Sequence, residues 1–322
     1  MGFGDSRVKK DGENFAQARL SRCGRAVQIV AIMASHDRYS VTRQSLLRLI
    51  DAANVAGFDI RVFHAVSNPS PSQVQQFSRD FPTVTSFRVP DDCYWACAMR
   101  RAFLEASAVA FDFLLWLNDD TMLDPTGLVS LVQAADNWPR QNIVAGSLRD
   151  DATGEPTYGL ARKSSIWKPL RLESLIPEGQ VLRGDAANGN VLLIPSPIVE
   201  RFGGFPGGFQ HNLADIHYTL SLSRKGVDII TPGEFIGTCS ENPVSALWKG
   251  AEPMSWSERW ALLTMPTGLS PRYWLRFALA NGGYLALLYA IQPYLMVIGF
   301  CLRDSWVRIF PSIGARKREL RR

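Results

Sequence analysis

Short apolar runs alternate along most of the chain with segments in which apolar residues recur at helical spacing. An apolar run bounded by polar residues predicts a buried strand, and the helical spacing predicts an amphipathic helix. The strands predicted in this way cover residues 26–33, 59–66, 84–89, 113–117, 143–148, 190–194 and 227–230. Helices are predicted after Ser40, around Val74 and Phe77, over residues 95–109 and 211–225, and from Asp124 and Pro125 onward. This alternation predicts an α/β fold with a mostly parallel sheet flanked by helices.

The apolar run at residues 113–117 leads directly into Asn118, Asp119 and Asp120. Its uninterrupted apolar character predicts a strand that is covered on both faces, as in a parallel sheet. Open α/β sheets bind ligands beyond the carboxyl ends of their strands, where these polar residues would lie. Carboxylates held there suit a hard divalent cation such as Mg²⁺ or Mn²⁺, which prefers oxygen ligands and shares them with substrate phosphates. The alternative is a simple strand-to-helix turn in which an Asp side chain caps the next helix.

The second half of the chain differs in composition, with more glycine and proline. Residues 150–189 are rich in glycine and proline, so we expect a long loop, and loops of this length are usually functional. A turn cluster at residues 203–208 precedes the predicted helix at 211–225, which we expect to end at Gly226. Asp215 lies near the start of this helix, where the helix dipole alone would stabilise a carboxylate.

Composition sets the class and compartment. The 322 residues allow one large domain or one domain with appendages, and a hydrophobic content of 46% supports a full core. The five cysteines are scattered, and Cys93 and Cys97 have no second pair at zinc spacing. We therefore expect reduced, structural thiols in a cytosolic compartment. Residues 1–25 are polar and lack the apolar core of a signal peptide, so we expect a flexible lead-in.

A charge-free stretch near the C-terminus predicts contact with a membrane. Residues 277–302 carry no charged side chain, and they exceed the length of about 20 residues that a spanning helix needs. Polar residues and Pro293 interrupt the stretch, and arginines flank both of its ends, so both ends are expected in the cytoplasm. We therefore expect an in-plane or shallow re-entrant segment that binds an anionic membrane surface, helped by the basic tail at residues 303–322. A buried core helix or a dimer interface is the alternative.

Several separated motifs stand in a characteristic order. They are Ser35-His36-Asp37-Arg38 after the first strand, Ser67-Asn68-Pro69-Ser70 after the second, Asn118-Asp119-Asp120, Gly189-Asn190 with the Gly203-Gly204-Phe205 turn, and Ala214-Asp215. In this set the chain resembles family 2 nucleotide-sugar glycosyltransferases of the A-type fold over about residues 26–240. It looks most similar to bacterial capsule or lipopolysaccharide sugar transferases that carry Asn-Asp-Asp and a lone Asp at the acceptor helix.

The resemblance implies a role for each motif. The nucleotide-diphosphate sugar donor would contact Ser35, Arg38, Ser67, Asn68, Asp92, Asn118 and Asp119. Asp120 would bind the Mg²⁺ or Mn²⁺ ion, and Asp215 would be the catalytic base. The acceptor, a glycan or lipid-linked glycan, would lie near Trp95, Gly189, Asn190 and His211, with His211 one helical turn before Asp215.

The chemistry of sugar transfer needs groups of these kinds. A metal clamp neutralises the leaving diphosphate, and a carboxylate base takes the proton of the attacking hydroxyl. A single base that faces the leaving group across the sugar implies one displacement with inversion, by analogy with inverting glycosidases. The expected activity is therefore inverting hexosyl or deoxyhexosyl transfer.

Departures from the family pattern keep a second reading open. Ser67 replaces an Asp that touches the base in relatives, Asn118 replaces the first Asp of the metal motif, and Ala214 replaces a Glu. Cys239 stands near the position where many relatives have a metal-binding His. These changes favour a catalytically impaired sugar- or nucleotide-binding or scaffold protein on the same fold. A nucleotidyltransferase is not expected, because the segment after the first strand lacks a glycine-rich phosphate loop.

The expected organisation has three parts. A lead-in at residues 1–25 precedes a catalytic domain at 26–240, and a helical, apolar extension with a basic tail follows at 241–322. No nucleic-acid partner is expected, because the tail lacks interleaved aromatic residues. We expect a cytoplasmic protein that is peripheral at the inner face of the cell membrane.

Overall fold

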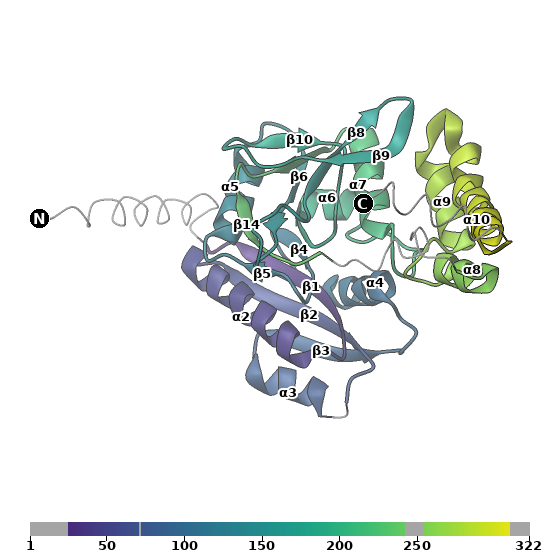
Figure 1. Cartoon of the computed structure of the whole chain (residues 1–322). Helices are drawn as coiled ribbons and strands as arrows, with labels where there is room; N and C mark the ends of the chain where they lie inside the picture. The colour runs from purple at the N-terminus through teal and green to yellow at the C-terminus, as the bar shows by residue number, and fades with distance from the viewer. Residues whose placement is uncertain (1–24, 71, 242–253, 310–322) are drawn as a thin grey trace, which may run out of the picture. The chain divides into compact units, whose positions relative to one another are not determined.

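The structure is a computed structural model that describes residues 25–70, 72–241 and 254–309 (Figure 1). The chain divides into two compact units, Met1–Glu241 and Asn242–Arg322. Residues 1–24 of the expected lead-in and residues 310–322 of the basic tail lie outside the described residues.

The first unit is built on an eight-stranded sheet of order β10-β13-β6-β12-β4-β1-β2-β3. Its strands are β1 (Gln28–His36), β2 (Asp59–Ser67), β3 (Val84–Val89), β4 (Phe113–Leu117), β6 (Asn142–Ala145), β10 (Leu182–Gly184), β12 (Val191–Pro195) and β13 (Asp228–Thr231). Six strands run in one direction, whereas β12 and β10 run against their neighbours. The flanking helices are α2 (Tyr39–Ala56), α3 (Gln73–Asp80), α4 (Trp95–Ala106), α5 (Gly127–Asn137), α6 (Ser196–Phe202) and α7 (Ala214–Arg224) (Figure 1). The predicted α/β fold with a mostly parallel sheet flanked by helices is confirmed.

Strand β4 lies in the middle of this sheet, and all of its residues are buried. Leu115 packs into the core that contains residues of α2 and α5, while Trp116 packs against Phe205 and against Tyr218 of α7. The antiparallel pairing of β12 with β4 sets Val191 opposite Leu117. The residues that precede β12 therefore lie beside the residues that follow β4, and this arrangement builds the candidate site.

The strand predicted at residues 143–148 is wrong in one respect, because the segment forms two strands. They are β6 and β7 (Ser147–Arg149), which lie in different sheets on either side of Gly146. A Cβ atom at Gly146 would lie 2.5 Å from Ile236 Cδ1 and 2.8 Å from Val191 Cβ. Only glycine fits where the chain leaves one sheet for the other.

The long loop expected at residues 150–189 is also wrong. The segment contains β8 (Leu160–Ser165), β9 (Lys168–Ser174), β10 and β11 (Ala186–Ala187), and three of these strands form a sheet of order β11-β8-β9. No residue of β9 is fully buried, so the sequence shows no apolar run there. A third sheet joins β7 to β5 (Met122–Leu123) and β14 (Phe235–Thr238), so β13 is not the final strand.

Three predicted helix starts differ from the structure, those of α2, α5 and α7. Helix α2 begins at Tyr39, ahead of Ser40, with Arg38 as its N-cap residue. Helix α5 begins at Gly127, because the Gly127 amide donates to the Asp124 carbonyl and closes a turn before the helix. The spacing of apolar residues does not predict turns of this kind, and so it does not predict the residue at which a helix begins.

The described part of the second unit consists of α8 (Trp256–Thr264), α9 (Pro271–Asn281), a short 3₁₀ turn (Gly283–Leu285) and α10 (Ala286–Ile309). A buried ion pair joins Arg259 of α8 to Asp304 of α10, with Nη2 and Oδ2 separated by 2.6 Å. The Tyr294 hydroxyl, near the middle of α10, donates to the Leu269 carbonyl at 3.0 Å. One side of α10 is therefore fixed to α8 and to the connection between α8 and α9.

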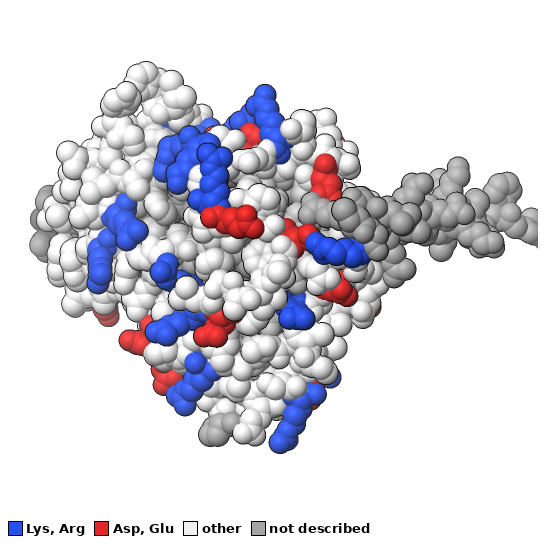
Figure 2. Space-filling view, turned by 180° about the vertical axis from the view of Figure 1, so that it is seen from behind, with Lys and Arg blue, Asp and Glu red and all other residues white. Residues whose placement is uncertain are grey.

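The other side of α10 is exposed and apolar. Among the described residues, the helical segment Gly283–Asp304 has the length and the composition to cross a membrane. Its most apolar window has a mean hydropathy of 1.9, and 17% of that window is buried. Charged side chains elsewhere are mixed in sign: on the face in Figure 2, groups of Lys and Arg lie next to Asp and Glu.

Candidate active site

Two loops meet at the carboxyl ends of β1 and β4. These strands pair in parallel, so Arg38, which follows β1, lies beside Asp119 and Asp120, which follow β4. Arg38 Nη2 donates to Asp119 Oδ1, and Nη1 donates to Asp120 Oδ2 at 3.3 Å. Thr42 Oγ1 donates to Asp119 Oδ2 at 3.2 Å. One guanidinium therefore bridges the two carboxylates. The spacing of apolar residues did not predict the contact between Thr42 and Asp119.

The two carboxylates differ in their surroundings. Asp119 is 2% exposed, and burial raises the pKa of its carboxyl to about 7 although the charge of Arg38 acts in the opposite direction. The Asp120 side chain is 30% exposed. Asp120 is therefore the member of the pair that is open to a ligand, while Asp119 orients Arg38.

The thiol of Cys239 and the side-chain amide of Asn190 lie next to Asp120. Cys239, directly after β14, donates from Sγ to Asp120 Oδ1 at 3.5 Å, and Asn190 Nδ2 donates to the same sulfur at 3.5 Å. Burial, followed by the neighbouring charge of Asp120, raises the pKa of Cys239 to about 12. Mg²⁺ and Mn²⁺ prefer oxygen ligands, so the thiol of Cys239 is a poor ligand for either ion. Within the described ranges, no group of three or more His, Cys, Asp or Glu side chains is arranged to hold a metal ion.

The predicted acceptor-side residues form one connected network. Trp95 Nε1 donates to Asn118 Oδ1 at 2.8 Å, and the Asn118 amide donates to the Asn190 carbonyl at 3.0 Å. The Gly189 amide donates to Asp215 Oδ2 at 2.8 Å. A Cβ atom at Gly189 would lie 2.7 Å from Trp95 Cη2 and 3.0 Å from Asp215 Cβ. Glycine is therefore required here, because the backbone fits between the indole and the carboxylate.

Asp215 lies in the first turn of α7 and accepts two backbone hydrogen bonds. Its Oδ1 accepts from the Ile216 amide at 2.8 Å, in addition to the bond from Gly189. Burial raises the pKa of the Asp215 carboxyl, and the two amides oppose this shift without reversing it. A carboxylate with a raised pKa accepts a proton near neutral pH more readily than an ordinary one.

Unusual backbone conformations border this region. Among the described residues other than glycine, positive φ occurs at Asp37 (44°), Asn68 (50°) and Leu213 (73°). Asp37 follows β1, Asn68 follows β2, and Leu213 directly precedes α7. Left-handed conformations are costly for side chains such as leucine and cluster at functional sites. They mark the turns that direct Arg38 and Asp215 into the site.

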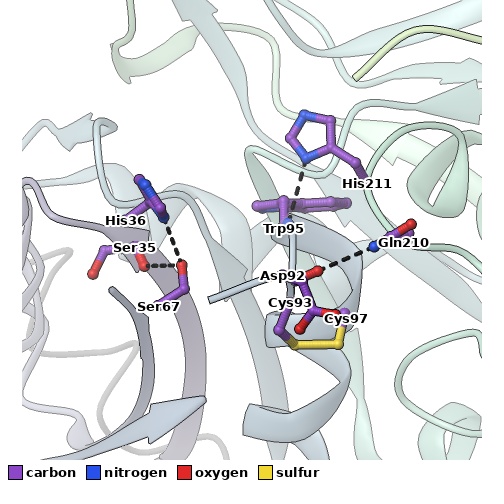
Figure 3. The surroundings of a disulfide bond; sticks show 9 residues. All are labelled: Ser35, His36, Ser67, Asp92, Cys93, Trp95, Cys97, Gln210 and His211. Carbon is purple, nitrogen blue, oxygen red and sulfur yellow. Dashed lines mark hydrogen bonds between the residues drawn. A yellow bond between two sulfur atoms is a disulfide. The ribbon is translucent and has the colours of Figure 1, made fainter. Parts of the chain in front are cut away.

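The serines predicted to contact the donor are buried in a hydrogen-bond network. Ser35 Oγ lies 2.7 Å from Nε2 of the buried His64, and Ser67 Oγ donates to the Ser35 carbonyl at 3.2 Å. His36 Nδ1 lies 3.0 Å from Ser67 Oγ (Figure 3). Burial lowers the pKa of His64 to about 3, so this histidine stays neutral. Ser35 and Ser67 therefore support the ends of β1 and β2, and the exposed Asn68 turns the chain after β2.

His211 does not occupy the place expected for it. Because α7 begins at Ala214, His211 lies outside the helix, and its Nδ1 accepts from the Trp95 amide at 3.3 Å. Burial lowers the pKa of His211 to about 4. The Asp92 side chain is exposed, and the Asp92 carbonyl accepts from Gln210 Nε2 at 3.0 Å. His211 and Asp92 thus form hydrogen bonds that hold the backbone around Trp95.

The expectation of reduced thiols is wrong for Cys93 and Cys97, which form a disulfide (Figure 3). Cys93 precedes α4 and Cys97 lies in its first turn, so their Cα atoms are 5.2 Å apart. This separation is within the range that a disulfide bridges. Cys239 and Cys301 are free, and Cys23 lies outside the described residues.

No protein-family model matches the chain, and no curated protein matches it. Among solved structures, S. aureus TarS 1–349 in complex with UDP-GlcNAc is similar at 7% identity and a TM-score of 0.49, over 79% of this chain and 67% of that chain. The mannosyltransferase PcManGT from Pyrobaculum calidifontis in complex with GDP-Man and Mn²⁺ is similar at 12% identity and a TM-score of 0.47, over 94% of each chain. The fold described above rests on the sheet topology of this chain itself.

Proposed function

We propose that this protein is an inverting glycosyltransferase that moves a hexosyl or deoxyhexosyl group from a nucleotide-diphosphate donor to a hydroxyl of a glycan or lipid-linked glycan. One observation carries the proposal: two adjacent residues connect the two carboxylates of the site, one directly and one through a thiol. The Gly189 amide donates to Asp215, and Asn190 reaches Asp120 through the thiol of Cys239. An accessible carboxylate is thereby linked to a partly buried one whose raised pKa suits a base.

We assign the donor diphosphate to the corner formed by Arg38 and Asp120. The Arg38 side chain is 45% exposed, and its planar N–H groups match the oxygens of a phosphate. Its contact with Asp120, at 3.3 Å, is long, so a diphosphate would compete with this carboxylate for Nη1. The contact with Asp119 holds the guanidinium in position meanwhile.

The donor set at this corner fits a divalent cation held by few protein ligands. Asp119 is occupied by Arg38 and Thr42, and the sulfur of Cys239 is a poor ligand for a hard cation, which leaves Asp120 as the ligand. Mg²⁺ is commonly bound through one or two carboxylates together with substrate phosphates and water. When bound, Mg²⁺ or Mn²⁺ would neutralise charge on the leaving diphosphate. Arg38 would supply a second, fixed positive charge to the same group.

Asp215 would act on the acceptor. Its carboxylate accepts the proton of the acceptor hydroxyl as the oxygen forms a bond to the anomeric carbon of the donor. The bond from that carbon to the diphosphate oxygen breaks, and the nucleoside diphosphate leaves with the bonding electrons. Trp95, anchored through Asn118, would form the wall against which the sugar or acceptor packs. A single displacement inverts the anomeric configuration.

The test of this assignment is donor binding. The full chain is titrated with a panel of nucleotide-diphosphate sugars, with and without Mg²⁺ or Mn²⁺, by calorimetry. We expect binding of a donor that depends on the cation and is abolished in Asp120→Asn, while Asp91→Asn, a change at an exposed carboxylate paired with Arg88, binds normally. If Asp120→Asn binds donor and cation as the native chain does, the assignment of Asp120 is wrong.

The second candidate function is a sugar- or nucleotide-binding or scaffold protein that has lost catalysis. It is favoured by the engagement of Asn118 with Trp95 and by Ala214, which supplies no second carboxylate beside Asp215. The two functions differ in outcome. A scaffold binds donor without turnover, whereas a transferase turns the donor over and loses most of that turnover in Asp215→Asn.

We further propose that the second unit attaches the protein to an anionic membrane surface, at the inner face of the cell membrane. The exposed side of α10 consists of large apolar residues, namely Leu287, Leu288, Ile291, Leu295, Ile298 and Leu302. Its opposite side, with Ala290, Val297 and Asp304, is buried against the rest of the unit. An exposed apolar surface of this kind fits a lipid or protein partner. Arg272 of α9 and Arg303 of α10 are exposed and add attraction to anionic headgroups.

The packing of α10 supports an in-plane orientation. The Tyr294 hydroxyl fixes the connection between α8 and α9 to the middle of the helix. If α10 crossed the bilayer, this irregular backbone would lie at the depth of the hydrocarbon, where lipid-exposed loops do not occur. With α10 in the plane of the interface, its exposed leucines enter the lipid while the connection faces water.

A further inference from the structure

The disulfide lies in the segment that carries Trp95 into the candidate site. Cys93 is 3% exposed and its amide donates to the Pro90 carbonyl at 2.9 Å, which forms a turn before α4. Cys97 belongs to the first turn of α4. The cross-link therefore encloses Tyr94, Trp95 and Ala96.

The start of α4 has no capping side chain. The N-cap residue Tyr94 makes no side-chain hydrogen bond to the helix, and the first amides of a helix have no partner within it. They bond instead to the segment before α7: the Trp95 amide donates to His211 Nδ1 at 3.3 Å and the Cys97 amide donates to the Gln210 carbonyl at 3.2 Å. Figure 3 shows Gln210 and His211 beside the cross-linked turn. The disulfide and these bonds together set the position of Trp95.

Trp95 in turn connects to the reacting groups. Its indole N–H reaches Asn118 at 2.8 Å, and its ring lies against Gly189, whose amide donates to Asp215. A change at the start of α4 is therefore transmitted through one side chain to both the metal-side loop and the base.

We infer that Cys93 and Cys97 are a reversible redox pair that positions Trp95, and hence the acceptor side of the active site; this inference rests on the proposed function. Two thiols are oxidised by an external disulfide such as glutathione disulfide: a thiolate attacks it, the mixed disulfide is resolved by the second thiolate, and two glutathione thiols leave. The cross-link closes a very short loop, so it adds little global stability through the unfolded state. Its effect is local, at Trp95. Intracellular disulfides of this kind are usually transient or redox-sensing.

Peptide mapping measures the redox state directly. Trypsin cleavage after Arg88 and Arg100 releases residues 89–100, which contain both cysteines, and the oxidised peptide is lighter by two hydrogen atoms. The full chain is equilibrated at graded ratios of reduced to oxidised glutathione. We expect interconversion of the two forms. A pair that stays reduced at every ratio, or oxidised at every ratio, overturns the inference.

Hydrogen–deuterium exchange then tests the positioning. In the reduced chain we expect faster exchange of the amides of residues 94–97 and of Gly189 than in the oxidised chain. The variant Cys93→Ser/Cys97→Ser should exchange like the reduced chain at every glutathione ratio, and Cys301→Ser, which changes a free cysteine in α10, should respond like the native chain. Identical exchange in the two redox states overturns the inference. Since this readout needs no substrate, it decides the matter even if no transferase activity exists.

Kinetics separates positioning from mere stabilisation. Reduction should raise the acceptor KM and lower kcat, and the total loss in kcat/KM should be at most about 100-fold, the scale of a small misplacement. The double serine variant should be insensitive to glutathione. Transfer kinetics that do not change although the peptide is converted would show that Trp95 is not positioned by the pair.

Discussion

Three aspartates of this protein have the same side chain and three different environments. Asp119 is buried under Arg38, Asp120 faces solvent beside Cys239, and Asp215 is enclosed by backbone amides and by Trp95. Burial disfavours the charged form of a carboxylate, whereas a nearby guanidinium favours it. The environments thus separate a carboxylate that orients a cationic side chain, one that is open to a ligand and one that suits a base.

Substitution of Asp215 tests the base at the residue scale. Asp215→Asn keeps the size of the side chain but removes the proton acceptor, and its one oxygen can accept from only one of the Gly189 and Ile216 amides. Turnover should fall about 10²–10⁴-fold, the usual contribution of a general base, while donor affinity remains. Initial rates and donor titrations of the two proteins measure this, with Asp91→Asn as the control. Near-native turnover in Asp215→Asn would exclude the assigned role.

The pH dependence follows from the same carboxylate. Because burial raises the pKa of Asp215, the acid limb of kcat should lie above the ordinary carboxyl range near about 4, and Asp215→Asn should lack it. A folded-state pKa above the unfolded value means that the protonated group stabilises the fold. This stability is fully present below the unfolded pKa and is lost as pH rises through the folded pKa. Thermal unfolding across this range should show a smaller slope in Asp215→Asn than in the native chain, because Asp119, whose pKa is also raised, still titrates in the variant.

At the scale of elements, the site depends on the connection between β11 and β12. Gly189 and Asn190 occupy this connection, which the antiparallel pairing of β12 holds beside the end of β4. The contacts of two residues on one short connection reach Asp215 directly and Asp120 through Cys239. Displacement of this connection should therefore disturb both halves of the site together.

Gly189→Ala tests this dependence. The added methyl group would lie 2.7 Å from Trp95 Cη2 and 3.0 Å from Asp215 Cβ, so the indole or the carboxylate must move. We expect a loss of stability of about 1–3 kcal/mol from overpacking and a fall in kcat/KM of up to about 100-fold. Gly299→Ala, at a helix position with open space around it, is the control. Native kinetics in Gly189→Ala would show that the connection is not rigidly coupled to the base.

The same elements show how much of the structure can be predicted from the sequence. Strand β4 and its position beside a polar loop were predictable, because an apolar run of this length has few other interpretations. The β8–β9 hairpin was not, since its strands are partly exposed and polar residues break the period. The bond of His211 to Trp95 depends on where α7 begins, and the disulfide was missed because scattered cysteines predict reduced thiols. Helix starts are set by local turn geometry, to which apolar spacing is insensitive.

At the scale of the whole molecule, the first unit has a buried core around β4 and the second has an apolar exterior. The exposed side of α10 is unlike the surface of a soluble monomer, in which large apolar patches are rare. An enzyme that glycosylates a lipid-linked acceptor would benefit from attachment to the bilayer that holds its substrate. The membrane surface remains a prediction for this unit, as does the position of the basic tail.

Vesicle flotation tests the attachment. The full chain should float with vesicles that contain an anionic lipid, and Leu288→Gln/Leu295→Gln should weaken binding by at least about tenfold, because each leucine buries apolar area in the lipid. Both leucines are exposed, so the fold should not change. The matched control is Leu47→Gln/Leu104→Gln, two exposed leucines of the first unit. Equal binding by both double variants would contradict membrane attachment through α10 and would indicate that its apolar side binds a protein partner.

The most direct measurement of the central claim is the product of the reaction. The full chain is incubated with each nucleotide-diphosphate sugar, a divalent cation and either candidate acceptors or water alone, and the anomeric configuration of the released or transferred sugar is followed by NMR together with the nucleoside diphosphate. The account predicts that a donor is cleaved to nucleoside diphosphate and a sugar product of inverted configuration, and that Asp215→Asn abolishes this turnover. A product of retained configuration would contradict the single displacement, and a chain that binds and cleaves none of the donors would contradict the assignment as a glycosyltransferase.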